Sequence, residues 1–137
     1  MPLPEPALGW RLRVGVDIVG VARVARLVTE NEGIERTVFS ERELADCLGR
    51  KRCHEHMAVR FAAKEAVLKA IGTGLGRRMN WTDVEIVRPG RGRPEVVLHG
   101  EVAAWAKRNG IGAVDVSLSH ADGLALAHAI VVVDGAP

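Results

Sequence analysis

The segment of residues 55–71 constrains the fold more than any other part of the chain. Its apolar residues recur at helical spacing, and Gly72 follows directly, as a residue that commonly ends a helix. A helix buries its apolar side chains only against other elements, so the rest of the chain has to pack around it. With 137 residues, 47% of them hydrophobic, the chain is long enough for one core of this kind.

Strands and shorter helices are predicted on both sides of this helix. Residues 11–18 alternate, with Val14, Val16 and Ile18 on one face, as in a half-buried strand. The other predicted elements are a helix at 22–30 ended by Gly33, a helix at about 41–48 opened by a capping box of Ser40 and Glu43, strands at 83–88 and 94–98, a helix at 101–108, and strands at 113–119 and 124–133.

The order of elements is therefore strand, three helices, two strands, helix, two strands. This order predicts an α+β fold, a single domain in which a largely antiparallel sheet packs on helices. Residues 1–12 contain three prolines and are expected to form a flexible arm before the domain at 13–137. The arm lacks the basic and apolar regions of a secretory leader, so none is expected.

The composition excludes several functions. The longest apolar stretch, residues 124–133, is too short to span a membrane, and the two cysteines form no disulfide framework, which favours a cytoplasmic location. The formal net charge is only +2, but fifteen of the nineteen basic residues are Arg, whose guanidinium suits phosphates and carboxylates. Without tyrosine or clustered aromatic residues, a nucleic-acid partner is not expected.

Asp17 and Glu65 are carboxylates in places where a carboxylate is costly unless it caps, pairs or coordinates. Asp17 lies at the end of an apolar strand pattern, and two roles stay open for it: the N-cap of the following helix and a metal ligand. Glu65 falls in an apolar sector of the long helix, where an i,i+4 pair with Lys69 and a metal ligand both stay open. Two carboxylates on different elements suit Mg²⁺, and Arg60, Lys64 and Lys69 are spaced to meet its phosphate ligands.

Two other groups of residues carry weaker signals. Cys47, Cys53, His54 and His56 match no usual zinc spacing, so a buried thiol and exposed imidazoles are expected instead. The glycine-rich turn at 72–74 resembles a phosphate-binding turn but matches neither a P-loop nor a dinucleotide fingerprint.

Three segments resemble the signature of a known family: GVDIVGVAR at residues 15–23, RFAAKEAVLKAIGTG at 60–74 and SLSH at 117–120. Their order and spacing are similar to those of the holo-acyl-carrier-protein synthases, the small single-domain class of 4′-phosphopantetheinyl transferases. The resemblance runs over about residues 14–134. It implies an enzyme that transfers the 4′-phosphopantetheine arm of coenzyme A to a serine of an apo acyl carrier protein, releasing 3′,5′-adenosine bisphosphate.

The resemblance also implies residue roles. Asp17 and Glu65 match metal ligands for Mg²⁺, with Mn²⁺ as an alternative ion, and with Lys69 they form the implied catalytic set. The implied coenzyme A site comprises Arg52, Arg60, Lys69, Gly72, Gly74, Pro94, Ser119 and His120. Gly92-Arg93-Pro94 stands where the family usually has Gly-Lys-Pro. The general base stays open between Glu65, His120 and a metal-bound water.

The implied assembly is a homotrimer with sites between neighbouring subunits. The acidic carrier protein is expected to dock on the helix after Asp17, at Arg23 and Arg26, with Arg36 in a loop nearby. Gly20 departs from the family, in which many members have Glu. Whether the carrier serves fatty-acid or polyketide synthesis is not specified, and a non-catalytic module that binds a nucleotide or the carrier protein stays open as the alternative.

Overall fold

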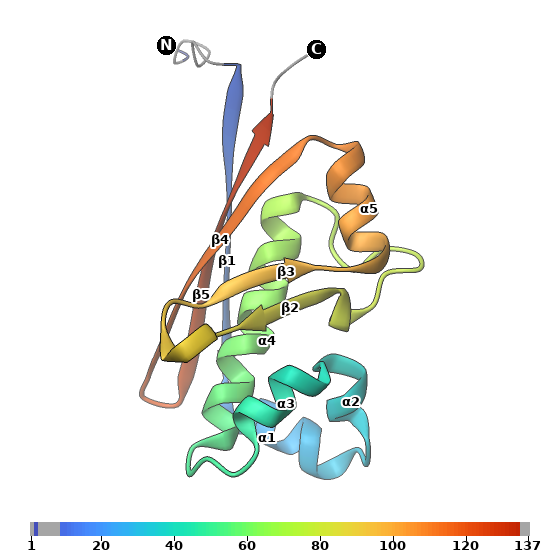
Figure 1. Cartoon of the computed structure of the whole chain (residues 1–137). Coiled ribbons are helices and arrows are strands. Elements are labelled where there is room, and N and C mark those ends of the chain that lie inside the picture. Colours follow the sequence, from blue (N-terminus) through green and yellow to red (C-terminus); the bar gives the residue numbers. More distant parts are fainter. Residues whose placement is uncertain (1, 3–8, 135–137) are drawn as a thin grey trace.

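The computed structural model describes residue 2 and residues 9–134. Helix α4 (Cys53–Ile71) lies at its centre, beginning two residues before the predicted start. Antiparallel strands cover one side of α4 in the order β1-β5-β4 (Figure 1), with β1 at Trp10–Gly20, β4 at Ile111–Ala121 and β5 at Leu124–Asp134. A second antiparallel sheet pairs β2 (Val84–Val87) with β3 (Glu95–Leu98).

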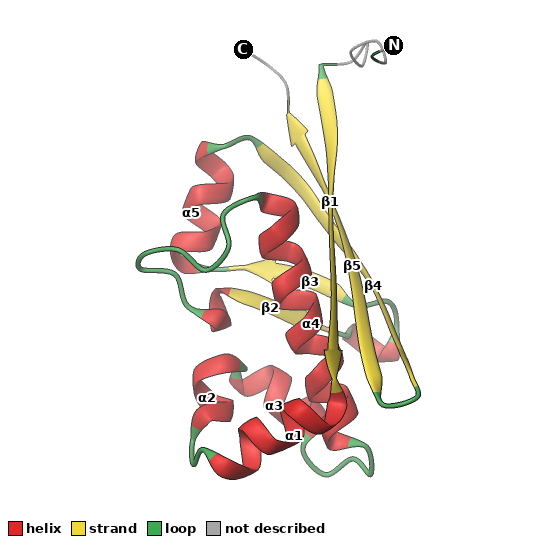
Figure 2. Cartoon of the chain, turned by 180° about the vertical axis from the view of Figure 1, so that it is seen from behind, coloured by secondary structure: helices red, strands yellow, loops and turns green. Residues whose placement is uncertain are grey.

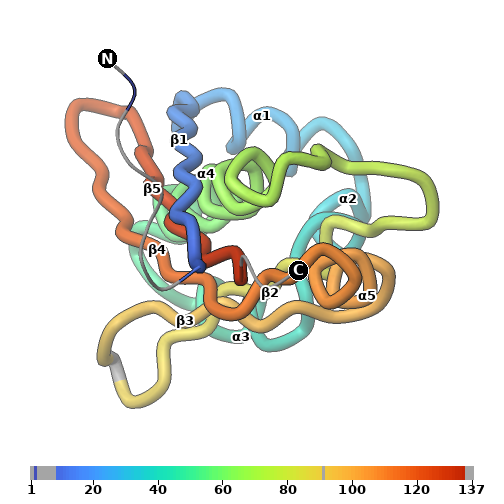
Figure 3. The backbone as a smooth tube through the Cα atoms, turned by 90° about the horizontal axis from the view of Figure 1, so that it is seen from above, coloured from blue at the N-terminus to red at the C-terminus, as the bar shows by residue number. Residues whose placement is uncertain are grey.

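The remaining helices surround α4 and the two sheets, as the view from above shows (Figure 3). They are α1 (Val21–Glu30), α2 (Ile34–Val38), α3 (Glu41–Cys47) and α5 (Gly100–Arg108), with short 3₁₀ helices at Trp81–Asp83 and Pro89–Arg91. The predicted α+β fold is thereby confirmed, and so is the capping box, because Ser40 and Glu43 bond each other's backbone amides at the start of α3. Helix α2 was not predicted.

Small side chains let the sheet lie close against α4. Ala62, Ala63 and Ala66 of the helix are fully buried in the same core as Ala127 and Ala129 of β5. Such alanines bring the two backbones together without leaving cavities. Figure 2 shows the result from behind, with the long strands running alongside α4.

The buried face of β1 is opposite to the one its alternation suggests. Val14, Val16 and Ile18 are 63%, 55% and 58% exposed, whereas Gly15 faces α4 and Val19 is buried. The alternation predicts a strand with two unlike faces, and the expectation that its apolar face packs inside the chain is wrong. The protein leaves an apolar sheet face outside instead.

The strand β1 also begins earlier than predicted. Trp10 pairs with Asp134 and Leu12 with Val132 of β5, so the end of the predicted arm, residues 10–12, belongs to the sheet. Most of that arm, residues 1 and 3–8, lies outside the described residues. No helix in the described part of the chain is long and apolar enough to cross a membrane.

Lys64 belongs to a buried polar cluster and not to a phosphate site. Its ammonium is fully buried and donates hydrogen bonds to Glu43 Oε1 at 2.7 Å, to the Trp81 carbonyl oxygen at 3.1 Å and to the Val84 carbonyl oxygen. Burial lowers the pKa of Lys64, while Glu43 opposes this effect. The expectation that Lys64 meets phosphates is therefore wrong, since all its donors point into the core.

Candidate active site

A close approach of β1 to α4 sets the position of the acidic side chains. A Cβ atom on Gly15 would lie 2.0 Å from the Ala66 carbonyl oxygen and 2.7 Å from the Ala70 amide nitrogen. Both are backbone atoms of a packed helix, so only glycine leaves room for the contact. Asp17 follows two residues later and therefore faces α4 from the same side of the strand.

An ion pair holds Asp17 across this strand–helix contact. Lys69 Nζ donates hydrogen bonds to Asp17 Oδ1 at 2.9 Å and to the Val16 carbonyl oxygen at 3.1 Å. This geometry excludes one alternative for each carboxylate and leaves the metal-ligand role as a prediction. Gly20 is the N-cap of α1, so Asp17 does not cap that helix, and the ion pair of Lys69 goes to Asp17 instead of to Glu65 on its own helix.

Asp17 and Glu65 form an acidic pair that the Lys69 ion pair leaves partly unsatisfied. Asp17 Oδ2 is buried and has no hydrogen-bond partner within the described ranges. Burial raises the pKa of Glu65 and the nearby Asp17 carboxylate raises it further, while Lys69 and Arg23 act in the opposite direction.

A hard cation would relieve both conditions. Asp17 and Glu65 fit Mg²⁺, which takes one or two protein carboxylates and leaves its other positions to water and phosphates. Among the residues that the structure describes, no group of three or more His, Cys, Asp or Glu side chains could hold a metal ion. A cation at this pair would have two protein carboxylates and would take its remaining ligands from elsewhere.

An open groove of about 530 Å³ lies between the N-terminal half of α4, the β2–β3 connection and the end of β4. It brings together three residues of the predicted coenzyme A site, since Pro94, Ser119 and His120 all line it. Arg88 and Arg93 line it too, and both stand in a basic cluster that the sequence makes visible. Two guanidinium groups in one groove suit a ligand that carries phosphates.

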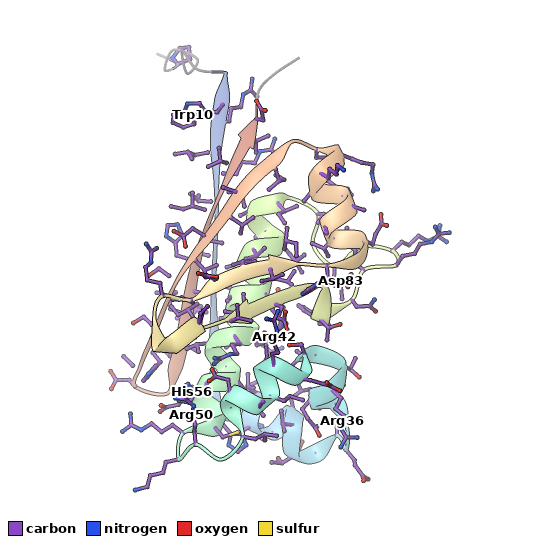
Figure 4. The ribbon with its side chains drawn as sticks, viewed as in Figure 1. Trp10, Arg36, Arg42, Arg50, His56 and Asp83 are labelled. Atoms are coloured by element: carbon purple, nitrogen blue, oxygen red, sulfur yellow. The ribbon has the colours of Figure 1, made fainter. Side chains whose placement is uncertain are left out.

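His56 lines the groove, whereas the sequence predicts only exposed imidazoles at His54 and His56; that expectation is wrong, because both are half-buried. His56 lines the groove from α4, and Figure 4 shows it beside Arg50 at the N-terminal end of that helix. Burial lowers the pKa of His56, and the charges of Arg50 and Arg60 lower it further, so its imidazole is neutral near pH 7. The neighbouring Cys47 is buried as expected, and burial raises its pKa to about 11, which disfavours the thiolate that zinc requires.

Other predicted coenzyme A residues do not line this groove. Arg60 is 2% exposed and its guanidinium forms an ion pair with Asp46, so no donor of this side chain is presented to solvent. Arg52 is 72% exposed and precedes α4. Gly72 and Gly74 have φ values of 93° and 61° and follow the opposite end of α4.

The groove and the carboxylate pair lie on opposite flanks of α4. Glu65 follows His56 by nine residues, which at about 100° per residue places their side chains roughly half a turn apart. Lys69 adds about 40° more and stays on the Glu65 side. Within one copy of the chain, the groove and the carboxylate pair are therefore separate features.

Comparison with known proteins identifies the superfamily of the chain. The family model described as the 4′-phosphopantetheinyl transferase superfamily matches residues 13–127. The chain belongs to this superfamily. The resemblance carried by the three sequence segments is thereby confirmed.

Two curated relatives within the superfamily bear the name holo-[acyl-carrier-protein] synthase. The protein of Moorella thermoacetica is 44% identical over 120 residues, which cover 88% of this chain and 93% of that protein. The protein of Geobacter sulfurreducens is 46% identical over 121 residues, covering 88% and 94%.

Solved structures of the superfamily share the fold. The synthase from Neisseria meningitidis superposes with a TM-score of 0.79 at 28% identity, covering 87% of this chain and 96% of that one. The synthase from Helicobacter pylori, solved in complex with coenzyme A, gives a TM-score of 0.74 at 28% identity, covering 86% and 98%.

Helix α1 carries the two arginines at which the carrier protein is expected to dock. Arg23 and Arg26 are exposed and line a cavity of about 250 Å³ together with Leu27 and Phe61. Arg23 lies close enough to Glu65 to affect its pKa, so the arginine surface of α1 adjoins the carboxylate pair. Arg36 lies in α2 and not in a loop, against a different cavity.

Proposed function

We propose that the chain transfers the 4′-phosphopantetheine arm of coenzyme A to a serine of an apo acyl carrier protein, releasing 3′,5′-adenosine bisphosphate. The observation that carries the proposal is the Asp17–Lys69 pair with Glu65 beside it. This cluster lies in the segments that identify the superfamily. Its relatives of 44% and 46% identity bear the name of this activity, and the Helicobacter pylori structure contains coenzyme A.

The reaction forms one bond and breaks one. The serine oxygen bonds to the phosphorus of the phosphopantetheine arm, and the bond from that phosphorus to the bridging oxygen of the pyrophosphate breaks. Its electron pair leaves with 3′,5′-adenosine bisphosphate, and the serine proton goes to a base. Glu65 and His120 are the candidate side chains for that base.

Asp17 and Glu65 would hold Mg²⁺, or Mn²⁺ in its place, through the buried Asp17 Oδ2 and the Glu65 carboxylate. The ion would neutralise charge that develops on the pyrophosphate. Lys69 is 52% exposed although it is paired with Asp17, so its ammonium can also donate to a phosphate oxygen.

The groove is the proposed site for the nucleotide part of coenzyme A. Arg88 and Arg93 supply guanidinium groups for phosphates, and Pro94, Ser119 and His120 supply the wall and end of the groove. Of the predicted coenzyme A residues that do not line the groove, Arg52 and Lys69 are exposed enough to contact the bound coenzyme. Contacts by Arg60, Gly72 and Gly74 stay predictions.

A homotrimer with sites between subunits is the proposed assembly. Large exposed apolar side chains gather on the outer face of the β1-β5-β4 sheet: Leu12, Val14, Val16, Ile18, Leu126 and Ile130, each 38–63% exposed. An apolar patch of this extent marks an interface in soluble proteins. Assembly would also let the carboxylates of one subunit meet the groove of its neighbour, which the half-turn between them on α4 prevents within one copy.

A measurement of the oligomeric state tests the proposed homotrimer directly. Val16→Asp should dissociate the assembly in analytical ultracentrifugation and abolish transfer, because a charge cannot be buried in an apolar interface. Leu48→Asp is the matched control, since Leu48 is 57% exposed and lies outside the sheet. A wild-type protein that is monomeric while it transfers at full rate would contradict the proposal.

The test of the activity is mass spectrometry of an apo carrier protein incubated with coenzyme A, Mg²⁺ and this chain. The expected result is a mass increase of one phosphopantetheine group, lost when the ion is chelated. Binding of coenzyme A without any modified carrier protein would support the non-catalytic alternative instead. We also propose a cytoplasmic location, which is compatible with the free thiols of Cys47 and Cys53.

A further inference from the structure

Glu55 is an acidic residue beside two predicted coenzyme A contacts. Its Oε2 atom lies 3.7 Å from His120 Nδ1 at the end of β4 and 3.8 Å from Arg52 Nη1 just before α4. Oε2 is buried and has no hydrogen-bond partner in the part of the chain that is described, although the Glu55 side chain as a whole is 31% exposed. One carboxylate oxygen therefore faces both basic side chains and is satisfied by neither.

We propose that Glu55 is a positioning residue that orients His120 and Arg52 toward the nucleotide part of coenzyme A. The inference rests on the proposed function, because it gives these two side chains a ligand. The carboxylate faces Nδ1 of the His120 ring, which leaves Nε2 for the groove that His120 lines. On the other side it lies 3.8 Å from the guanidinium of Arg52, a side chain that is 72% exposed.

A carboxylate near a groove that binds phosphates weakens coenzyme A binding unless it orients basic side chains that contact the ligand. Glu55 opposes a phosphate by direct repulsion, so a benefit from Glu55 must come from the orientation of His120 and Arg52. Helix position offers a competing explanation, because an acidic residue in the first turn of any helix gains from the helix dipole. The two explanations differ in what removal of Glu55 does to coenzyme A binding.

The experiment compares Glu55→Ala and Glu55→Gln with Glu101→Ala. Glu101 is a matched control because it also lies in the first turn of a helix, is 33% exposed and pairs with one arginine, Arg108, away from the groove. We expect both Glu55 variants to raise the KM for coenzyme A about three- to ten-fold. The KM for carrier protein, the kcat at saturating coenzyme A and the melting temperature should stay near wild type, and Glu101→Ala should leave the KM for coenzyme A unchanged.

A double-mutant cycle with His120→Ala tests whether Glu55 acts through the imidazole. In that background the loss caused by Glu55→Gln should shrink, because one of its two partners is already gone. Independent, additive losses would overturn the proposal, as would Glu55 variants with the wild-type KM for coenzyme A or an equal shift after Glu101→Ala. Failure of the wild-type protein to modify a carrier protein would overturn the proposed function instead, so the two failures are distinguishable.

Discussion

Gly15→Ala should damage both stability and transfer, because the new methyl group meets backbone and not a movable side chain. An ordinary contact needs about 3.4 Å, and the added Cβ would lie 2.0 Å from the Ala66 carbonyl oxygen, so β1 has to move by roughly 1.4 Å. Overpacking of this kind costs about 1–3 kcal/mol, and we expect the upper end. The same shift would stretch the Lys69–Asp17 contact from 2.9 Å to about 4.3 Å, which breaks the hydrogen bond.

Thermal unfolding and a transfer assay measure these two effects. A loss of about 3 kcal/mol corresponds to a melting temperature lower by roughly 10 °C for a domain of this size. Transfer should fall further than the folded fraction does, because the carboxylate site is displaced even in folded molecules. Gly112→Ala is the control, since its Cβ would lie 3.8 Å from the nearest atom, the Val132 carbonyl oxygen. A Gly15→Ala protein with wild-type stability and transfer would refute this reasoning.

Three further predictions address charge. Asp17→Ala and Glu65→Gln should abolish transfer while leaving the fold intact, and transfer at wild-type rates under limiting Mg²⁺ would contradict the metal site. The double variant Arg23→Glu with Arg26→Glu should raise the KM for carrier protein and not that for coenzyme A, most clearly at low salt. Glu85→Gln should cost about 1–3 kcal/mol of stability at neutral pH, and the cost should shrink as the pH falls from about 4.5 towards 2.

The prediction for Glu85 follows from its partners. Burial raises its pKa, but hydrogen bonds from Arg42, Ser40 and His99 outweigh burial and lower the pKa to about 2. A carboxyl whose pKa is depressed by folding stabilises the protein above its unfolded pKa. That stability is lost as the pH falls from the ordinary pKa of 4.5 through the folded pKa of about 2.

Local patterns were sufficient to predict the elements whose cause is local. Helix α4 is marked by its periodicity and by Gly72, and α3 is marked by the reciprocal bonds of Ser40 and Glu43. The antiparallel strands followed from alternation and turn residues in the same way. The short α2 was not predicted, because its five residues show no periodicity and its N-cap, Gly33, looks like the end of the helix before it.

The candidate site was predicted only as far as residue types and the family resemblance allowed. Asp17, Glu65 and Lys69 are brought together as expected, but their pairing depends on how closely β1 approaches α4. The role of Lys64 was misjudged because a helical wheel does not say which side of the helix another element covers. Its buried partner Glu43 comes from α3, far along the chain.

The face of β1 was misjudged for a related reason. A period of two separates the residues of a strand into two faces, but it does not say whether a face is covered by the same chain or by another copy. Val14, Val16 and Ile18 have the composition of a core face, while Gly15 and Asp17 lie on the face that α4 occupies. A strand can have this pattern when both of its faces are covered, one by its own helix and one by a neighbouring subunit, so the misassigned face is itself an argument for the proposed assembly.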